Sequence, residues 1–160
     1  MKTVILFATK YGSVRKAAEL LKEKLNGQTI LVDVAKEPVP SLDEYDTVIL
    51  GGSAYMGRIQ KKLSAYIQNN LDTLLKKRIG VFLCAGATES EQQGKELKDA
   101  YPSGLYDRAL ARGVLGYGYD FDKMRFFDRF IVSKILGNTK SVSAFYDDKI
   151  TQFAQTMNAD

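Results

Sequence analysis

The chain has 160 residues, of which 45% are apolar and 26% are charged, and its formal charge is +4. This length and balance fit one globular domain, 1–160, with a continuous core. The single cysteine, Cys84, excludes an internal disulfide and suits a reducing cytoplasm. We expect no signal peptide and no membrane span, because no apolar run approaches about 18 residues. The absence of histidine removes His-based triads and nearly all zinc and haem sites.

The first half of the chain alternates strands and helices. In chain order, the predicted elements are a strand at 3–8, a helix at 14–25, a strand at 29–34, a loop at 36–46 and a strand at 47–50. The first strand (TVILFA) is an uninterrupted apolar run, typical of a strand buried on both faces. The first helix carries apolar residues at helical spacing. The strand at 47–50 ends in Gly51-Gly52.

The second half continues the same alternation. Its predicted elements are a helix at 59–75, a strand at 79–85, a polar helix at 90–101, a weaker strand at 109–120 and helices at 126–136 and 142–157. Alternating strands and helices predict a parallel sheet with helices on both faces. Five strands in a chain of this length fit the α/β flavodoxin-like, doubly wound fold with strand order 2-1-3-4-5. Ligands of such sheets bind at the carboxyl ends of the strands, between strands one and three.

Three loops rich in glycine, alanine and hydroxyl groups follow strands one, three and four. They cover 9–14 (TKYGSV), 51–58 (GGSAYMGR) and 84–88 (CAGAT). In the first, Gly12 allows close approach of the backbone, and the start of the helix offers unpaired N–H groups and a partial positive charge. This pattern indicates an anion-binding turn of the kind that holds a phosphate. The alternative is that Ser13 only caps the helix and Gly12 only makes the turn.

Other anion-binding motifs are absent from the sequence. There is no G-x-x-x-x-G-K-[ST] and no G-x-G-x-x-G after the first strand, which excludes a P-loop and a dinucleotide fingerprint. A phospho-accepting receiver domain needs acidic residues after strands one and three. Ala8-Thr9 and Gly51-Gly52 stand there instead.

Nearly the whole chain resembles a known family. TKYGSV resembles the T-x-T-G-x-T phosphate loop of flavodoxins, which bind FMN. The stretches ILGGSAYMGRIQKKL (49–63) and YDFDKMRFFDRFIVSKIL (119–136) resemble the branch of that family that includes the quinone-dependent protoporphyrinogen oxidases of bacteria. The second stretch is the more specific, because ordinary flavodoxins have nothing like it.

The resemblance implies an FMN site at the three loops. The residues that would hold the FMN phosphate are Thr9, Lys10, Tyr11, Gly12, Ser13 and Val14. Those that would contact the ring are Ser53, Ala54, Tyr55, Met56, Gly57, Cys84, Ala85, Gly86, Ala87, Thr88 and Tyr117, with Tyr119 beside them. Tyr11 and Val14 stand where the family has small hydroxyl residues, so backbone N–H groups must serve those places. We interpret Cys84 as a small buried hydrophobe at the end of a strand rather than as a redox thiol. Arg58 either solvates the start of a helix or faces the N1 edge of a reduced flavin as a cation.

The charge of the chain separates it from typical flavodoxins, which are strongly acidic. Segment 122–140 mixes five basic side chains with many apolar ones, a composition that can lie on an anionic membrane surface at the inner face of the cell membrane. The alternative is that its apolar face only covers the sheet. Expected partners are a redox protein or a quinone and an acidic small molecule such as a porphyrinogen; nucleic acid is not expected.

Three functions follow from these features. The first is an FMN-dependent oxidoreductase similar to protoporphyrinogen oxidase, in which the flavin carries the chemistry and no side chain is required as acid or base. The second is an electron carrier of the flavodoxin type without a substrate of its own. The third is a binding module of the same fold without flavin.

Overall fold

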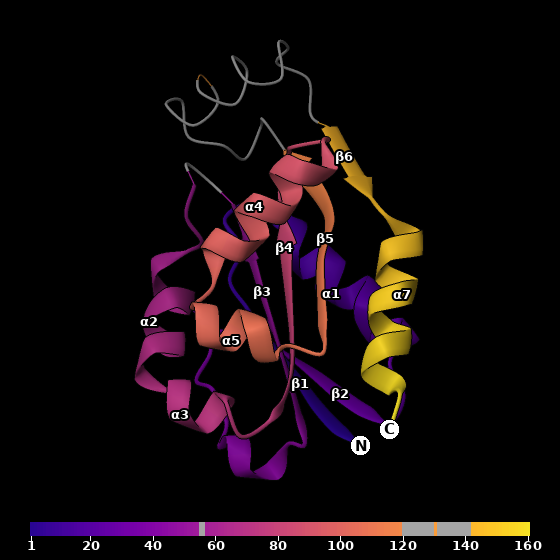
Figure 1. Cartoon of the computed structure of the whole chain (residues 1–160). Helices are drawn as coiled ribbons and strands as arrows, with labels where there is room; N and C mark the ends of the chain where they lie inside the picture. The colour runs from indigo at the N-terminus through magenta and orange to yellow at the C-terminus, as the bar shows by residue number, and fades with distance from the viewer. Residues whose placement is uncertain (55–56, 120–129, 131–141) are drawn as a thin grey trace.

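The computed structural model describes residues 1–54, 57–119, 130 and 142–160. Within these residues one sheet has the strand order β2-β1-β3-β4-β5-β6 (Figure 1). The first five strands pair in parallel, and β6 runs antiparallel to β5. The strands are β1 Lys2–Phe7, β2 Gln28–Asp33, β3 Thr47–Ser53, β4 Arg78–Cys84, β5 Ala111–Tyr119 and β6 Val142–Phe145.

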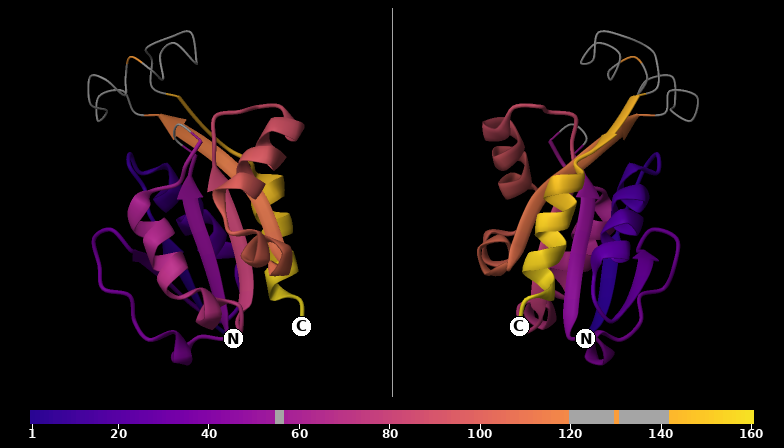
Figure 2. Two further views of the ribbon diagram at one scale, coloured as in Figure 1. Left: turned by 60° about the vertical axis from the view of Figure 1, so that its left-hand side comes forward. Right: turned by 90° about the vertical axis from the view of Figure 1, so that its right-hand side faces the viewer.

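Helices cover both faces of the sheet. They are α1 Ser13–Lys24, the short 3-10 helix η1 Leu42–Glu44, α2 Lys61–Asn69, α3 Leu71–Leu74, α4 Ser90–Ala100, α5 Ser103–Arg108 and α7 Asp147–Asn158. Helices α1 and α7 lie side by side on one face, whereas α2 to α5 lie on the other (Figure 2). The carboxyl ends of β1, β3 and β4 point to the same edge of the sheet, which we call the carboxyl edge (Figure 1).

The strand β1 shows why the sheet is buried on both sides. Val4 and Leu6 pack in the core beneath α2 to α5, whereas Ile5 and Phe7 pack beneath α1 and α7. Successive side chains of a strand point to opposite faces, so a strand covered on both faces needs apolar residues throughout. The predicted α/β fold and the strand order 2-1-3-4-5 are confirmed.

The last predicted helix is wrong in its first turn. We expected a helix from Val142, but 142–145 form β6, and α7 begins at Asp147. Asp147 and Asp148 lie in the first turn of α7, where the partial positive charge of a helix N-terminus stabilises carboxylates. The strand is a tertiary effect, since β6 forms only by pairing with β5.

Two boundaries in the middle of the chain also differ from the expectation. The helix predicted at 59–75 is two helices, because the side-chain amide of Asn70 donates to the carbonyl oxygen of Tyr66 (2.8 Å) where α2 ends. Gly51 and Gly52 belong to β3 rather than to the loop, and a Cβ on Gly51 would lie 2.1 Å from the Phe82 ring. These glycines are therefore required by packing.

The segment 122–140 lies outside the described residues, apart from Phe130. In the described part of the chain, no helix is both long and apolar enough to cross a membrane.

Candidate functional site

The loops after β1, β3 and β4 lie together at the carboxyl edge (Figure 1). The backbone N–H of Ala54 donates to the carbonyl oxygen of Cys84 (2.9 Å), and that of Ala85 donates to the carbonyl oxygen of Gly116 (3.0 Å). These bonds extend the ladders of the sheet by one residue beyond β3 and β4. The loops that follow therefore start from fixed positions.

The turn between β1 and α1 is built to leave the start of the helix open. Gly12 occupies the N-cap position with φ of 94°, and its N–H donates to the hydroxyl oxygen of Thr9 (2.9 Å). The first bond of the helix runs from the N–H of Lys16 to the carbonyl oxygen of Gly12 (3.1 Å). The N–H groups of Ser13, Val14 and Arg15 precede that bond, so they point out of the helix end.

Nothing acidic neutralises this end of α1. Its first turn contains no carboxylate, and among the described residues no side chain caps it. Gly12 has no atom within 4 Å of the position a Cβ would occupy, so the turn is also open on that side. An uncapped helix start with free N–H groups and a partial positive charge is suited to an anion.

Ser13 is the first residue of α1 and not its N-cap, so the alternative interpretation of Ser13 as a helix cap is wrong. Its hydroxyl is hydrogen-bonded to the thiol of Cys84. Cys84 is only 2% exposed, and burial raises the pKa of its thiol to about 12, with the bond from Ser13 lowering it in part. The thiol is therefore neutral at physiological pH, so it packs as a small apolar group beneath α1.

The loop after β3 is closed by Gln60. Its side-chain amide donates to the hydroxyl oxygen of Ser53 (2.8 Å), and its carbonyl oxygen accepts from the backbone N–H of Ser53 (3.2 Å). Gly57 lies between them with φ of 75° and open space around it. Tyr55 and Met56, the predicted ring contacts of this loop, lie outside the described residues.

The loop after β4 is held by a buried side chain of α4. The amide of Gln93 donates to the carbonyl oxygen of Ala87 (2.7 Å). Along this loop exposure increases from the buried Ala85 through the half-buried Gly86 and Ala87 to the exposed Thr88. Gln60 and Gln93 position two of the three loops, and sequence reasoning missed both because a glutamine within a helical pattern carries no local signal.

Basic side chains surround the open end of α1. The ammonium of Lys10 lies 5.5 Å from the centre of the Tyr11 ring. The guanidinium of Arg15 lies 5.0 Å from the centre of the Phe7 ring and 4.0 Å from a carboxylate oxygen of Asp33, at the end of β2. Arg15 also lies 4.0 Å from a carboxylate oxygen of Glu37, so two carboxylates balance its charge.

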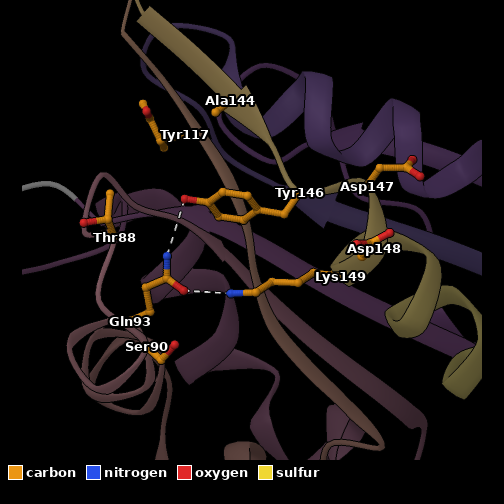
Figure 3. Close-up of a pocket in the computed structure, with 9 residues that line it drawn as sticks. All are labelled: Thr88, Ser90, Gln93, Tyr117, Ala144, Tyr146, Asp147, Asp148 and Lys149. Atoms are coloured by element: carbon orange, nitrogen blue, oxygen red, sulfur yellow. Dashed lines mark hydrogen bonds between the residues drawn. The ribbon is translucent and has the colours of Figure 1, made fainter.

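The predicted ring contacts Thr88 and Tyr117 border one cavity (Figure 3). Its volume is about 570 Å³, and it lies between the start of α4, the β5–β6 pair and the start of α7. The residues that line it are Thr88, Ser90, Gln93, Tyr117, Ala144, Tyr146, Asp147, Asp148 and Lys149. The structure thus places Tyr117 on the same cavity as Thr88 of the loop after β4. The side chain of Tyr119 lies outside the described ones.

Comparison with known proteins identifies the family. The family model described as Flavodoxin domain matches residues 4–144. The chain belongs to the flavodoxin domain family. Protoporphyrinogen IX dehydrogenase [quinone] of Escherichia coli K12 is 22% identical over 143 residues, which cover 85% of this chain and 79% of that protein.

Solved flavodoxins share the fold of this flavodoxin domain. A short-chain flavodoxin associated with a bacterial microcompartment has a TM-score of 0.63 at 12% identity, covering 98% of this chain and 96% of that one. The two-electron reduced flavodoxin of Megasphaera elsdenii has a TM-score of 0.62 at 11% identity, with 98% and 99% covered. At these identities the likeness shows the fold alone.

The residues at the carboxyl edge fit the phosphate of FMN. The uncapped N–H groups of α1, the open turn at Gly12 and the nearby cations all suit a dianion. The described residues contain no group of three or more His, Cys, Asp or Glu side chains that could hold a metal ion.

Proposed function

We propose that this flavodoxin-domain protein binds FMN at the carboxyl edge and acts as an oxidoreductase similar to the protoporphyrinogen dehydrogenase that it matches. The observation that carries the proposal is the open start of α1, where three backbone N–H groups precede the first bond of the helix and no acidic side chain stands in the first turn. Such an end favours a phosphate over a neutral group.

The chain's own residues would act by binding and orientation. The backbone N–H groups of Ser13, Val14 and Arg15 would donate to the phosphate, in place of the hydroxyls that Tyr11 and Val14 do not supply. Thr9 braces the turn through Gly12. The loops held by Gln60 and Gln93 would border the isoalloxazine ring. Bound FMN supplies the electron-transfer chemistry.

The proposed substrate is an acidic porphyrinogen, and the proposed acceptor is a quinone or a redox protein. The match to a protoporphyrinogen dehydrogenase and the net charge of +4 support an acidic substrate. The basic and apolar composition of 122–140 supports contact with an anionic membrane surface. Co-sedimentation with vesicles of anionic and of neutral lipid tests that contact, and equal recovery with both would contradict it.

The test of the function has two steps. An absorption spectrum of the purified protein, followed by titration with FMN, should show one bound flavin per chain; no binding would overturn the proposal in favour of a flavin-free module. Anaerobic mixing with protoporphyrinogen and a soluble quinone should then produce porphyrin catalytically. Reversible reduction of the bound flavin without porphyrin formation would instead assign an electron carrier.

A further inference from the structure

The side chain of Gln93 connects the elements that border the cavity between α4, the β5–β6 pair and α7. Gln93 is 5% exposed, and its amide donates to Ala87 (2.7 Å) while its carbonyl oxygen accepts from the ammonium of Lys149 (2.8 Å). The same amide lies 3.5 Å from the hydroxyl oxygen of Tyr146 (Figure 3). These bonds connect three elements and fix which way the Gln93 amide points.

The arrangement leaves hydrogen-bond donors directed to the cavity. An ammonium has three N–H donors, and the bond to Gln93 uses one of those of Lys149. The hydroxyl of Tyr146 accepts from Gln93, so its own proton is available to donate. Thr88 and Ser90 add hydroxyls at the side of the cavity. A ligand with carbonyl oxygens would match these donors.

The walls of the cavity suit a flat ring. Tyr117 and Tyr146 contribute aromatic surfaces, and Ala144, which pairs with Tyr117 across β5 and β6, leaves room because its side chain is small (Figure 3). The ammonium of Lys149 lies 5.0 Å from the centre of the Tyr146 ring, which holds the lysine by a cation–π contact. The volume of about 570 Å³ lies within the range of small-molecule sites, roughly 300–1,000 Å³.

The charges at the rim distinguish between ligands. Asp147 and Asp148 both line the cavity, beside the cation Lys149. Asp147 forms an ion pair with Lys24 of α1 (3.1 Å), so the charges of these four described side chains balance. They offer no surplus positive charge to a ligand with several carboxylates, whereas a neutral ring needs none.

We propose that this cavity binds the ring of a neutral aromatic dicarbonyl compound of the quinone class, with Lys149 and Tyr146 donating to a carbonyl oxygen. Because the cavity shares Thr88 and Tyr117 with the proposed flavin contacts, a bound quinone would lie beside the flavin. The assignment as the site of the electron acceptor rests on the proposed function. The acidic porphyrinogen finds no surplus positive charge among these rim residues, so we expect it to bind elsewhere.

Equilibrium dialysis of menadione, a neutral naphthoquinone, against FMN-free and FMN-loaded protein tests the proposal without relying on turnover. We expect saturable binding of one menadione per chain in both forms. Lys149→Met should weaken binding about tenfold, the loss of roughly one hydrogen bond to a charged group. Lys95→Met is the matched control, because Lys95 of α4 pairs with Asp99 on the exposed surface outside the cavity, and it should leave binding unchanged.

A second variant, Ala144→Leu, should block menadione by filling the space beside Tyr117 and Tyr146 while the affinity for FMN stays unchanged. The proposal is overturned if Lys149→Met and Ala144→Leu both bind menadione as the natural chain does, or if menadione displaces FMN. It is also overturned if coproporphyrin, with four carboxylates, binds more tightly than menadione and is lost in the same variants. Failure of FMN to bind while menadione still does would overturn the proposed function and leave the cavity assignment standing.

Discussion

At the carboxyl edge of the sheet, backbone N–H groups at the start of α1 face outward, whereas at the opposite, amino edge the Arg78 side chain binds the end of α7. Thr29, Thr3, Thr47 and Arg78 form one row across four strands at the amino edge, and the three threonine hydroxyls are buried without a hydrogen-bond partner among the described residues. The guanidinium of Arg78 donates to carbonyl oxygens at the end of α7, at 3.3 and 2.6 Å. The amino edge therefore holds α7 against the sheet through Arg78, and the carboxyl edge offers the open start of α1 to a ligand.

The largest expected effect is on the affinity for FMN. Ser13→Asp places a carboxylate in the first turn of α1, where it should repel the phosphate and weaken FMN binding about 100-fold. The same change should not lower the stability of the helix, because a negative charge at this end interacts favourably with the dipole. Fluorescence titration with FMN and denaturant unfolding measure the two effects.

The matched control is Ser103→Asp, which adds the same charge at the first residue of α5, away from the carboxyl edge. It should leave the affinity for FMN unchanged. If both variants lose FMN equally, the net charge of the protein and not the start of α1 governs binding, and the contrast between the two edges fails.

The amino edge should respond in the opposite way. Arg78→Met removes the bonds to the end of α7 and should lower the free energy of unfolding by about 1.5–3 kcal/mol, with no change in the affinity for FMN. Lys76→Met removes an equal charge from an exposed position nearby and should change little. Urea unfolding of both variants, with FMN titration of each, would contradict the contrast if Arg78→Met weakened FMN binding as strongly as Ser13→Asp.

A smaller effect is expected from the hydrogen bonds between Gln60 and Ser53 that close the loop after β3. Gln60→Ala removes two hydrogen bonds to Ser53 and should weaken FMN binding about tenfold, because the loop must then be ordered on binding. Gln68→Ala, on the exposed surface of α2, is the control. Equal dissociation constants for the two variants would show that Gln60 does not position the site.

The smallest effect concerns Cys84, which lies beneath the carboxyl edge but belongs to the core. Its pKa is raised by burial to about 12, above the value of about 8.5 for a thiol in an unfolded chain. The unfolded chain therefore loses its proton first, so the stability from the neutral thiol is complete below about pH 8.5 and is lost as the pH rises toward 12.

Unfolding at pH 7 and pH 10 measures this loss. The free energy of unfolding should fall more between these values in the natural chain than in Cys84→Ala. Burial raises the pKa of Tyr101 in both proteins, and the charge of Cys84 adds to that rise only in the natural chain, so the larger fall expected there contains both contributions. An identical fall in the two would mean that the thiol is accessible to solvent.

The sequence predicted the features that repeat along a strand or follow from topology. The apolar run of β1 is readable because both faces of that strand are buried, and the convergence of the three loops follows from a parallel sheet. The turn at Gly12 was readable because an open helix start needs glycine and no acid.

What the sequence did not reveal depends on contacts between distant residues. The strand β6 forms only by pairing with β5, and the long segment 120–141 separates the two strands in the sequence. The residues of β6 also continue the apolar helical pattern of the segment that follows. The pair Gln93 and Lys149 joins α4 to α7 with no local pattern in either helix. Side chains that act across elements in this way are visible only in three dimensions.

The central claim, that the start of α1 holds the phosphate of FMN, is tested most directly by comparing FMN with riboflavin. The two ligands share the same ring and differ in the phosphate. We expect FMN to bind at least about 100-fold more tightly than riboflavin, and we expect Ser13→Asp to abolish most of this difference. Equal dissociation constants for the two ligands would contradict it.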